Sequence, residues 1–80
     1  MGHDSFPVQL LRMQKEGTEL TARERAVLRR LALGDTQPEI AERFGKSLET
    51  IRSATKVARA RLGARTNAHA VAIALSLELI

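Results

Sequence analysis

The chain has 80 residues, no cysteine and a formal net charge of +4. A chain this short forms one small domain, and without cysteine it can form neither a disulfide nor a thiolate metal site. Hydrophobic residues make up 44% of the sequence but include only two Phe and no Tyr or Trp, which predicts a folded domain with an aliphatic core. This composition leaves little room for an elaborate catalytic site, and the excess of basic residues indicates a polyanionic partner.

No stretch of the sequence is typical of a membrane span or a signal peptide. The longest uncharged run covers residues 66–77, which is far short of the roughly 20 apolar residues that cross a bilayer. The N-terminus lacks a basic region followed by an apolar run. We therefore expect a cytoplasmic protein that has no membrane partner.

Residues 1–19 form an N-terminal extension ahead of the domain expected over residues 20–80. The apolar side chains between Phe6 and Gln14 are compatible with a short extra helix. The extension is too short to hold a further folded domain. A natural-looking start at Met1 favours a stand-alone protein, and an excised C-terminal fragment is the alternative.

Four segments carry the start and stop signals of helices. The predicted helices run over residues 21–33, 36–44, 47–62 and 68–79. The first two open with capping boxes, Thr21 with Glu24 and Thr36 with Glu39, in which each side chain bonds the backbone amide of the other residue. Glycines follow the first three helices at positions 34, 45 and 63. Since no window alternates apolar and polar residues, we expect an all-α fold without strands.

The second and third of these helices are spaced as a helix-turn-helix. The short second helix is joined to the longer third helix by the tight turn Gly45-Lys46-Ser47. A short helix, a turn that contains glycine and a longer basic helix are typical of this DNA-binding motif. A generic pair of packed helices has the same spacing, so the spacing alone leaves that alternative open.

The third helix separates into an aliphatic face and a basic face. The aliphatic face carries Ile51, Ala54, Ala58 and Leu62, and the opposite face carries Arg52, Lys56 and Arg59 beside the small Ser53 and Ala60. Cations grouped on one face repel one another, whereas a phosphate-lined groove removes that cost and releases counterions. The major groove of DNA accepts one such helix. A solvated basic face is the alternative, but the helix-turn-helix spacing favours DNA binding.

Several motifs, taken in order, resemble the LuxR/GerE-type helix-turn-helix domain. They are Leu20-Thr21-Ala22-Arg23-Glu24, Glu39-Ile40-Ala41-Glu42-Arg43-Phe44, Thr50-Ile51-Arg52 and Arg61-Leu62-Gly63-Ala64-Arg65. The resemblance covers about residues 20–77 and implies a four-helix transcription-factor domain. It implies that the third helix, here about residues 48–62, enters the major groove and that the fourth, here about residues 68–79, dimerises.

The resemblance also implies how individual residues meet DNA. The residues that match base-edge readers by position are Arg52, Ser53 and Lys56. Thr50 and Arg61 match positions that contact the DNA backbone, and we expect Arg59 and Arg65 to bind phosphates as well. Arg61 and Arg65 lie at and beyond the end of the third helix, from where a side chain reaches the backbone more readily than the base edges.

Part of the third helix is similar to a second family. Residues 50–53 and 58–62 are similar to the −35-reading region of sigma factors. Residues 64–71 fit the LuxR/GerE pattern and have no place in the sigma pattern. This segment therefore favours the LuxR/GerE type.

The fourth helix, capped by Thr66 or Asn67, is apolar on nearly every side, which a small monomer does not explain. One stripe consists of Ala68, Val71, Ala72, Leu75 and Leu79. The opposite stripe consists of Ala70, Ile73, Ala74, Leu77 and Ile80. Because a two-fold pair buries the same stripe on both copies, we expect a homodimer interface that contains Ala70, Ile73, Ala74 and Leu77. The alternative is that the N-terminal extension folds over this stripe.

The sequence as a whole predicts a homodimeric, sequence-specific regulator of transcription that binds double-stranded DNA. No enzyme activity, cofactor, metal or small-molecule substrate is expected, because His3 and His69 are far apart and no nucleophile has a base nearby. The alternative is an adaptor that uses the helix-turn-helix to dock RNA polymerase or another regulator, in the manner of sigma region 4.

Overall fold

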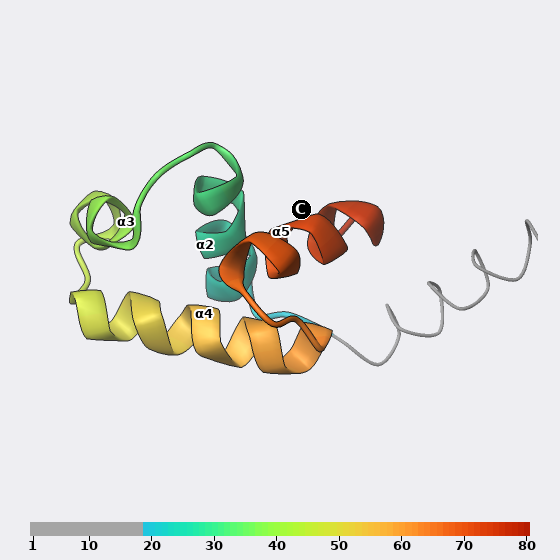
Figure 1. Ribbon diagram of the computed structural model, residues 1–80. Helices are drawn as coiled ribbons and strands as arrows, with labels where there is room; N and C mark the ends of the chain where they lie inside the picture. Colours follow the sequence, from blue (N-terminus) through green and yellow to red (C-terminus); the bar gives the residue numbers. More distant parts are fainter. Residues whose placement is uncertain (1–18) are drawn as a thin grey trace, which may run out of the picture.

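The computed structural model describes residues 19–80, which fold into four helices (Figure 1). The helices are α2 (Ala22–Ala32), α3 (Gln37–Phe44), α4 (Leu48–Leu62) and α5 (Asn67–Ser76). Residues 19–80 contain no strand, which confirms the expected all-α, four-helix architecture. The short helix expected between Phe6 and Gln14 lies outside the described residues. None of the four helices is long and apolar enough to cross a membrane.

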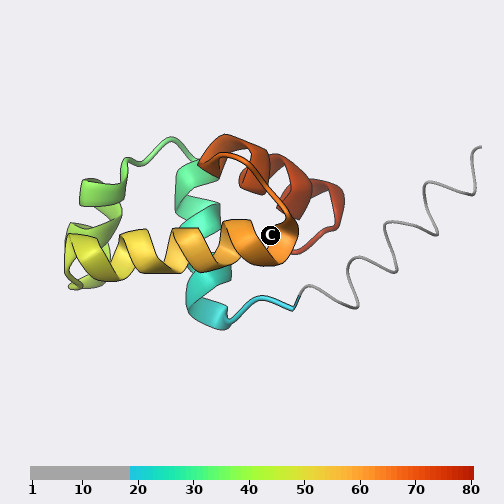
Figure 2. The same cartoon turned by 60° about the horizontal axis from the view of Figure 1, so that its bottom comes forward.

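Helices α2 and α4 form the centre of the domain. The long α4 runs along one side and α2 stands across it, with α3 beside the start of α4 and α5 beside its end (Figures 1 and 2). Each of α2 and α4 packs against the other and against both α3 and α5. The short connection between α3 and α4 makes these two helices the helix-turn-helix pair.

A hydroxyl side chain starts each helix, as the sequence predicts. The caps are Thr21, Thr36, Ser47 and Thr66, whose side-chain oxygens accept N–H bonds from Glu24, Glu39, Thr50 and His69. Both capping boxes are confirmed, since the Glu24 and Glu39 carboxylates accept from the Thr21 and Thr36 amides at 2.9 and 2.8 Å. Gly45 and Gly63 end α3 and α4 in the left-handed conformation, with φ of +64° and +66°.

Helix α5 ends earlier than predicted. The apolar pattern runs to Leu79, but the helix stops at Ser76 and Glu78 adopts a left-handed φ of +59°. The Leu79 amide then bonds the Ala74 carbonyl at 2.8 Å, as in a Schellman motif. This reversal returns the Leu79 side chain to the core at 9% exposure. The last apolar residues therefore belong to a folded-back turn and not to a longer helix.

The core consists of two clusters, both of which use α2 and α4. One cluster joins these helices to α5 and contains Leu20, Leu28, Ala58, Leu62, Ala70, Ala74, Leu77 and Leu79. The other joins them to α3 and contains Val27, Ile40, Ala41, Ile51 and Ala54. The aliphatic face predicted for the third helix is thus the buried face of α4. Because α4 is held in both clusters, its opposite face is presented rigidly to the outside.

Helix α5 packs inward with the face that the sequence analysis assigns to a dimer. Ala70 and Ala74 have no exposed surface and Leu77 has only 4%. Ile73 is half-buried against the same cluster. Buried side chains offer no surface to a second copy, so Ala70, Ala74 and Leu77 cannot form the predicted interface in this fold, while Ile73 keeps part of its surface exposed.

The opposite face of α5 is the exposed one. Ala68, Ala72 and Leu75 are exposed, with Leu75 at 54%, and Val71 is half-buried. Both stripes of this helix are almost equally apolar, so periodicity gives no basis for choosing between them. The choice depends on how Thr66 and the preceding turn direct the helix onto α2 and α4.

Candidate nucleic-acid interface

A partly buried chain of hydrogen bonds joins α3 to α4. The Gln37 side-chain amide donates to the Thr55 hydroxyl at 2.9 Å, and this hydroxyl donates to the Arg52 carbonyl at 2.8 Å. Thr55 is only 1% exposed, so its hydroxyl needs these partners to avoid a desolvation cost. Thr55 is not among the residues expected on the aliphatic face, although its position one turn after Ile51 and beside Leu62 on the helical wheel places it on the buried side.

A second polar contact ties the loop between α2 and α3 to both helices. Asp35 accepts from Arg30 of α2 at 2.7 Å and from Arg43 of α3 at 3.2 Å. The hydrogen bond from Arg30, together with the charges of Arg30 and Arg43, lowers the pKa of Asp35 below its ordinary value of 3.8. The carboxylate therefore stays ionised and holds the two helices at neutral pH.

The exposed face of α4 brings the predicted base readers together. Arg52, Ser53 and Lys56 are all exposed, and the small Ala60 lies one turn further along. Glu49 is exposed on the same side of the helix, at its start. This face therefore offers two cationic donors, one hydroxyl and one carboxylate acceptor within two to three helical turns.

The predicted phosphate-binding residues fall into two groups. Arg59 and Arg61 take part in the fold: Arg59 bonds the Asn67 side chain, and Arg61 donates to the Glu19 carbonyl at 2.7 Å. Thr50 is half-buried at the start of α4, and Arg65 is exposed after its end. The structure thus links the two arginines nearest the end of α4 to neighbouring segments of the domain.

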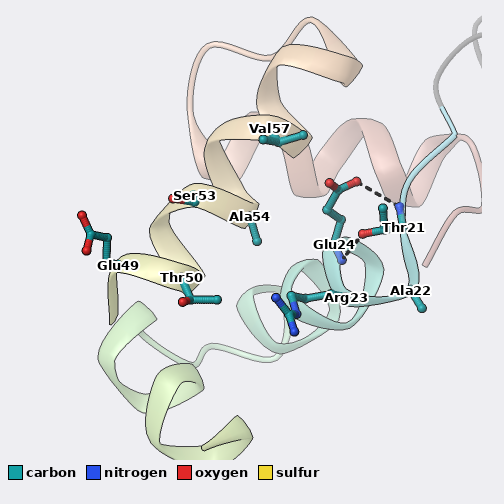
Figure 3. A pocket seen from close by; sticks show the side chains of 9 residues that line it. All are labelled: Thr21, Ala22, Arg23, Glu24, Glu49, Thr50, Ser53, Ala54 and Val57. Atoms are coloured by element: carbon teal, nitrogen blue, oxygen red, sulfur yellow. Dashed lines mark hydrogen bonds between the residues drawn. The ribbon is translucent and has the colours of Figure 1, made fainter. Parts of the chain in front are cut away.

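An open groove lies between the start of α2 and the first half of α4. Its volume is about 670 Å³, and its lining residues are Thr21, Ala22, Arg23, Glu24, Glu49, Thr50, Ser53, Ala54 and Val57 (Figure 3). The hydrogen bonds of the Thr21–Glu24 capping box lie at the α2 side of this groove, where Figure 3 draws them as dashed lines. Of the residues that border this groove, Val57 is not singled out by the sequence, and Arg23 appears there only within a family motif and not as a site residue. Neither belongs to a periodic motif that would single it out.

Most cations of residues 19–80, including those at this face, have no ion-pair partner within this part of the chain. Within residues 19–80, the ion pairs join Arg30 and Arg43 to Asp35, and Arg61 to Glu24. No carboxylate in this part of the chain pairs with Arg23, Arg52 or Lys56, although all three are exposed. The same residues 19–80 contain no group of three His, Asp or Glu side chains that could hold a metal ion. The groove and the outer face of α4 thus form a surface with unpaired positive charge.

This combination of a glycine turn, a braced helix pair and an exposed basic second helix defines a helix-turn-helix DNA-binding domain. Residues 18–63 match the family described as Sigma-70, region 4, and the chain belongs to this family. It is also 44% identical over 57 residues to the HTH-type transcriptional activator RamA of Corynebacterium glutamicum. That alignment covers 71% of this chain but 20% of the activator, so the chain spans about a fifth of the length of this relative.

The comparisons confirm the helix-turn-helix class and leave the finer type open. The family match ends at Gly63, so α5 lies outside it. The motifs in residues 50–62 are similar to both families considered in the sequence analysis, which explains why they do not separate the two. The assignment to the LuxR/GerE type, which depends on residues 64–71, stays a prediction.

Proposed function

We propose that this domain binds double-stranded DNA sequence-specifically as part of a transcription regulator, with α4 in the major groove. The observation that carries the proposal is the exposed side of α4, where Arg52, Ser53 and Lys56 share one face and the two cations have no carboxylate partner within residues 19–80. Arg and Lys donate to guanine O6 and N7, and Ser bonds several bases. Similarity to a transcriptional activator supports the same function.

Glu49 supports a particular orientation of α4 in the groove. Its carboxylate would be repelled by phosphates, so we expect the Glu49 side chain to face base edges while the neighbouring Thr50 faces a backbone strand. A carboxylate in the major groove accepts a hydrogen bond from the N4 amino group of cytosine. Arg52 and Lys56 then read guanines further along the same face.

The remaining predicted contacts serve the phosphates. Thr50 and Arg23 border the groove beside α4, where a DNA strand would pass (Figure 3). Arg59 and Arg61 already bond protein partners, but a guanidinium has five N–H donors and keeps several for a phosphate. Arg65 lies exposed beyond α4. These residues would supply affinity that does not depend on base sequence.

A homodimer through the exposed face of α5 completes the proposal. This face carries Ala68, Ala72 and Leu75, and α5 contains no Asp, Glu, Lys or Arg. Two copies related by a two-fold axis would therefore bury apolar surface without bringing like charges together. A hollow of about 310 Å³ between the end of α2 and the start of α5 offers room for an apolar side chain of the second copy. The pair would present two copies of α4 to two half-sites.

A salt series tests whether DNA is the partner. The logarithm of the association constant for random-sequence duplex should fall linearly with the logarithm of the salt concentration, because each phosphate contact releases counterions. Arg65→Gln, which removes a predicted phosphate contact, should reduce the slope by about 1, whereas Arg29→Gln, which removes the same charge from the exposed surface of α2, should leave it unchanged.

The second candidate function is a protein adaptor, which the exposure of Leu33 at 70% and Leu75 at 54% favours. An adaptor would bind random-sequence duplex little or not at all and would show no salt slope. That result would contradict DNA binding and would direct the search to RNA polymerase or another regulator.

A further inference from the structure

Val57 is an apolar side chain on an otherwise polar surface. It is 41% exposed and lies one turn after Ser53 on α4, at the border of the groove toward α2 (Figure 3). The other large hydrophobic side chains that are exposed in residues 19–80 are Leu33 and Leu75, neither of which is on α4. Val57 is thus the exposed large hydrophobic residue of the DNA-facing helix.

The fold does not require a valine at this position. The buried face of α4 consists of Ile51, Ala54, Thr55, Ala58 and Leu62, and Val57 is a member of neither core cluster. A β-branched side chain also lowers helix propensity slightly. A lysine, glutamine or alanine has a higher helix propensity and would suit an exposed site in this helix better. The stability of the fold therefore does not explain why this residue is a valine.

We propose that Val57 contacts the C5 methyl group of a thymine in the major groove and thereby sets a preference for thymine at one position of the binding site. This inference rests on the proposed function. The thymine methyl is the apolar group that a base pair displays in the major groove, and apolar side chains recognise it. The groove between α2 and α4 places Val57 where such a methyl can approach.

The surroundings of Val57 fit a thymine in duplex DNA. Ser53 is small, so it does not hold a base edge away from the valine methyls. Arg23 lines the opposite wall of the groove without a carboxylate partner in residues 19–80. A pyrimidine methyl lies close to the phosphates of its own strand, so one strand can offer its methyl to Val57 and a phosphate to Arg23.

The experiment removes the methyl group alone. A preferred duplex is first selected from a random pool with the 80-residue chain, and each thymine is then replaced in turn by uracil, which pairs identically but lacks the C5 methyl. We expect one position at which uracil weakens binding about fourfold, the effect of one buried methyl-sized group. Val57→Ala should bind the thymine and uracil duplexes equally at that position. Leu33→Ala, which shortens an exposed leucine outside α4, is the matched control and should keep the fourfold difference.

The outcomes separate this inference from the proposed function. A selected duplex at which every uracil replacement is neutral for the unmodified chain would overturn the role of Val57 while DNA binding stands. A fourfold effect that persists in Val57→Ala would assign the methyl contact to another residue and overturn it as well. A pool that yields no preferred sequence, with no salt-dependent binding, would overturn the proposed function itself.

Discussion

Arg52 connects the hydrogen bonds that join α3 to α4 with the outer surface of α4. Its carbonyl accepts the Thr55 hydroxyl on the inner side of α4, while its side chain is exposed on the outer side. Gln37 of α3 bonds the same hydroxyl. The backbone from which Arg52 projects is therefore held in place by two helices, as a side chain that reads a base edge requires.

Replacing Arg52 should reduce discrimination between DNA sequences. We expect Arg52→Ala to weaken binding to the selected duplex by about 1–3 kcal/mol and to narrow the difference from random DNA. Competition binding with the two duplexes measures this difference. Arg29→Ala removes an exposed arginine from α2 and should leave the ratio of the two affinities unchanged. An equal loss on both duplexes would identify Arg52 as a phosphate contact instead.

Asp35 should make the stability of the domain sensitive to acid. Its pKa is lower in the folded chain than the ordinary value of 3.8, chiefly because Arg30 donates a hydrogen bond to it. The stabilisation is therefore fully present above about pH 4 and is lost as the pH falls through the folded-state pKa. Urea unfolding should show Asp35→Asn to be less stable than the unmodified chain at pH 7, with a difference that shrinks toward pH 2. A difference that is constant with pH would mean that the charge of Asp35 contributes nothing.

The helix termini show which parts of the fold can be predicted from sequence. Thr21, Thr36 and Ser47 cap helices because a short side-chain oxygen satisfies a free backbone amide, an interaction between neighbours in the chain. The end of α5 depends instead on burial of Leu79 in a core built from three helices. Tertiary packing here forces Glu78 into a conformation that its own sequence neighbourhood does not favour.

Relief of this conformation should stabilise the domain. Glu78→Gly removes the cost of a left-handed φ at a residue with a Cβ and also removes a negative charge from the C-terminal end of α5. We expect the free energy of unfolding to rise by about 1 kcal/mol. Glu78→Ala removes the same charge but keeps the Cβ, so it should give little of this gain. If alanine stabilises as much as glycine in urea or thermal unfolding, backbone conformation is not the cause.

The exposed face of α5 determines how whole molecules associate. We expect Leu75→Glu to give a folded chain that sediments as a monomer, because it places two like charges across the two-fold axis. Its affinity for a two-part DNA site should fall roughly tenfold or more, since the second half-site is no longer tethered. Leu77→Glu, by contrast, should unfold the domain, because Leu77 is 4% exposed.

The unmodified chain supplies the reference for this comparison. If the unmodified chain sediments as a monomer at high micromolar concentration, both free and on DNA, the proposed homodimer through α5 is wrong.

The candidate site was largely predictable from sequence where it depends on one helix. The grouping of Arg52, Ser53 and Lys56 follows from their spacing on α4, and the structure exposes all three. The groove beside them was not predictable, since it brings Arg23 of α2 next to Val57 of α4. The contacts of such a groove join residues more than 30 positions apart, and no local pattern encodes them.

A map of backbone amide shifts in the NMR spectrum of the chain, recorded as duplex DNA is added, tests most directly whether α4 reads DNA. Binding through the helix-turn-helix predicts that the largest shifts cluster at the exposed positions of α4, including Arg52, Ser53 and Lys56, and at the start of α2 around Arg23. The Ala72 and Leu75 amides on the exposed face of α5 should shift with the monomer–dimer equilibrium and not with the base sequence of the duplex. Large, sequence-dependent shifts confined to α5, with α4 unchanged, would contradict the proposal that α4 reads DNA.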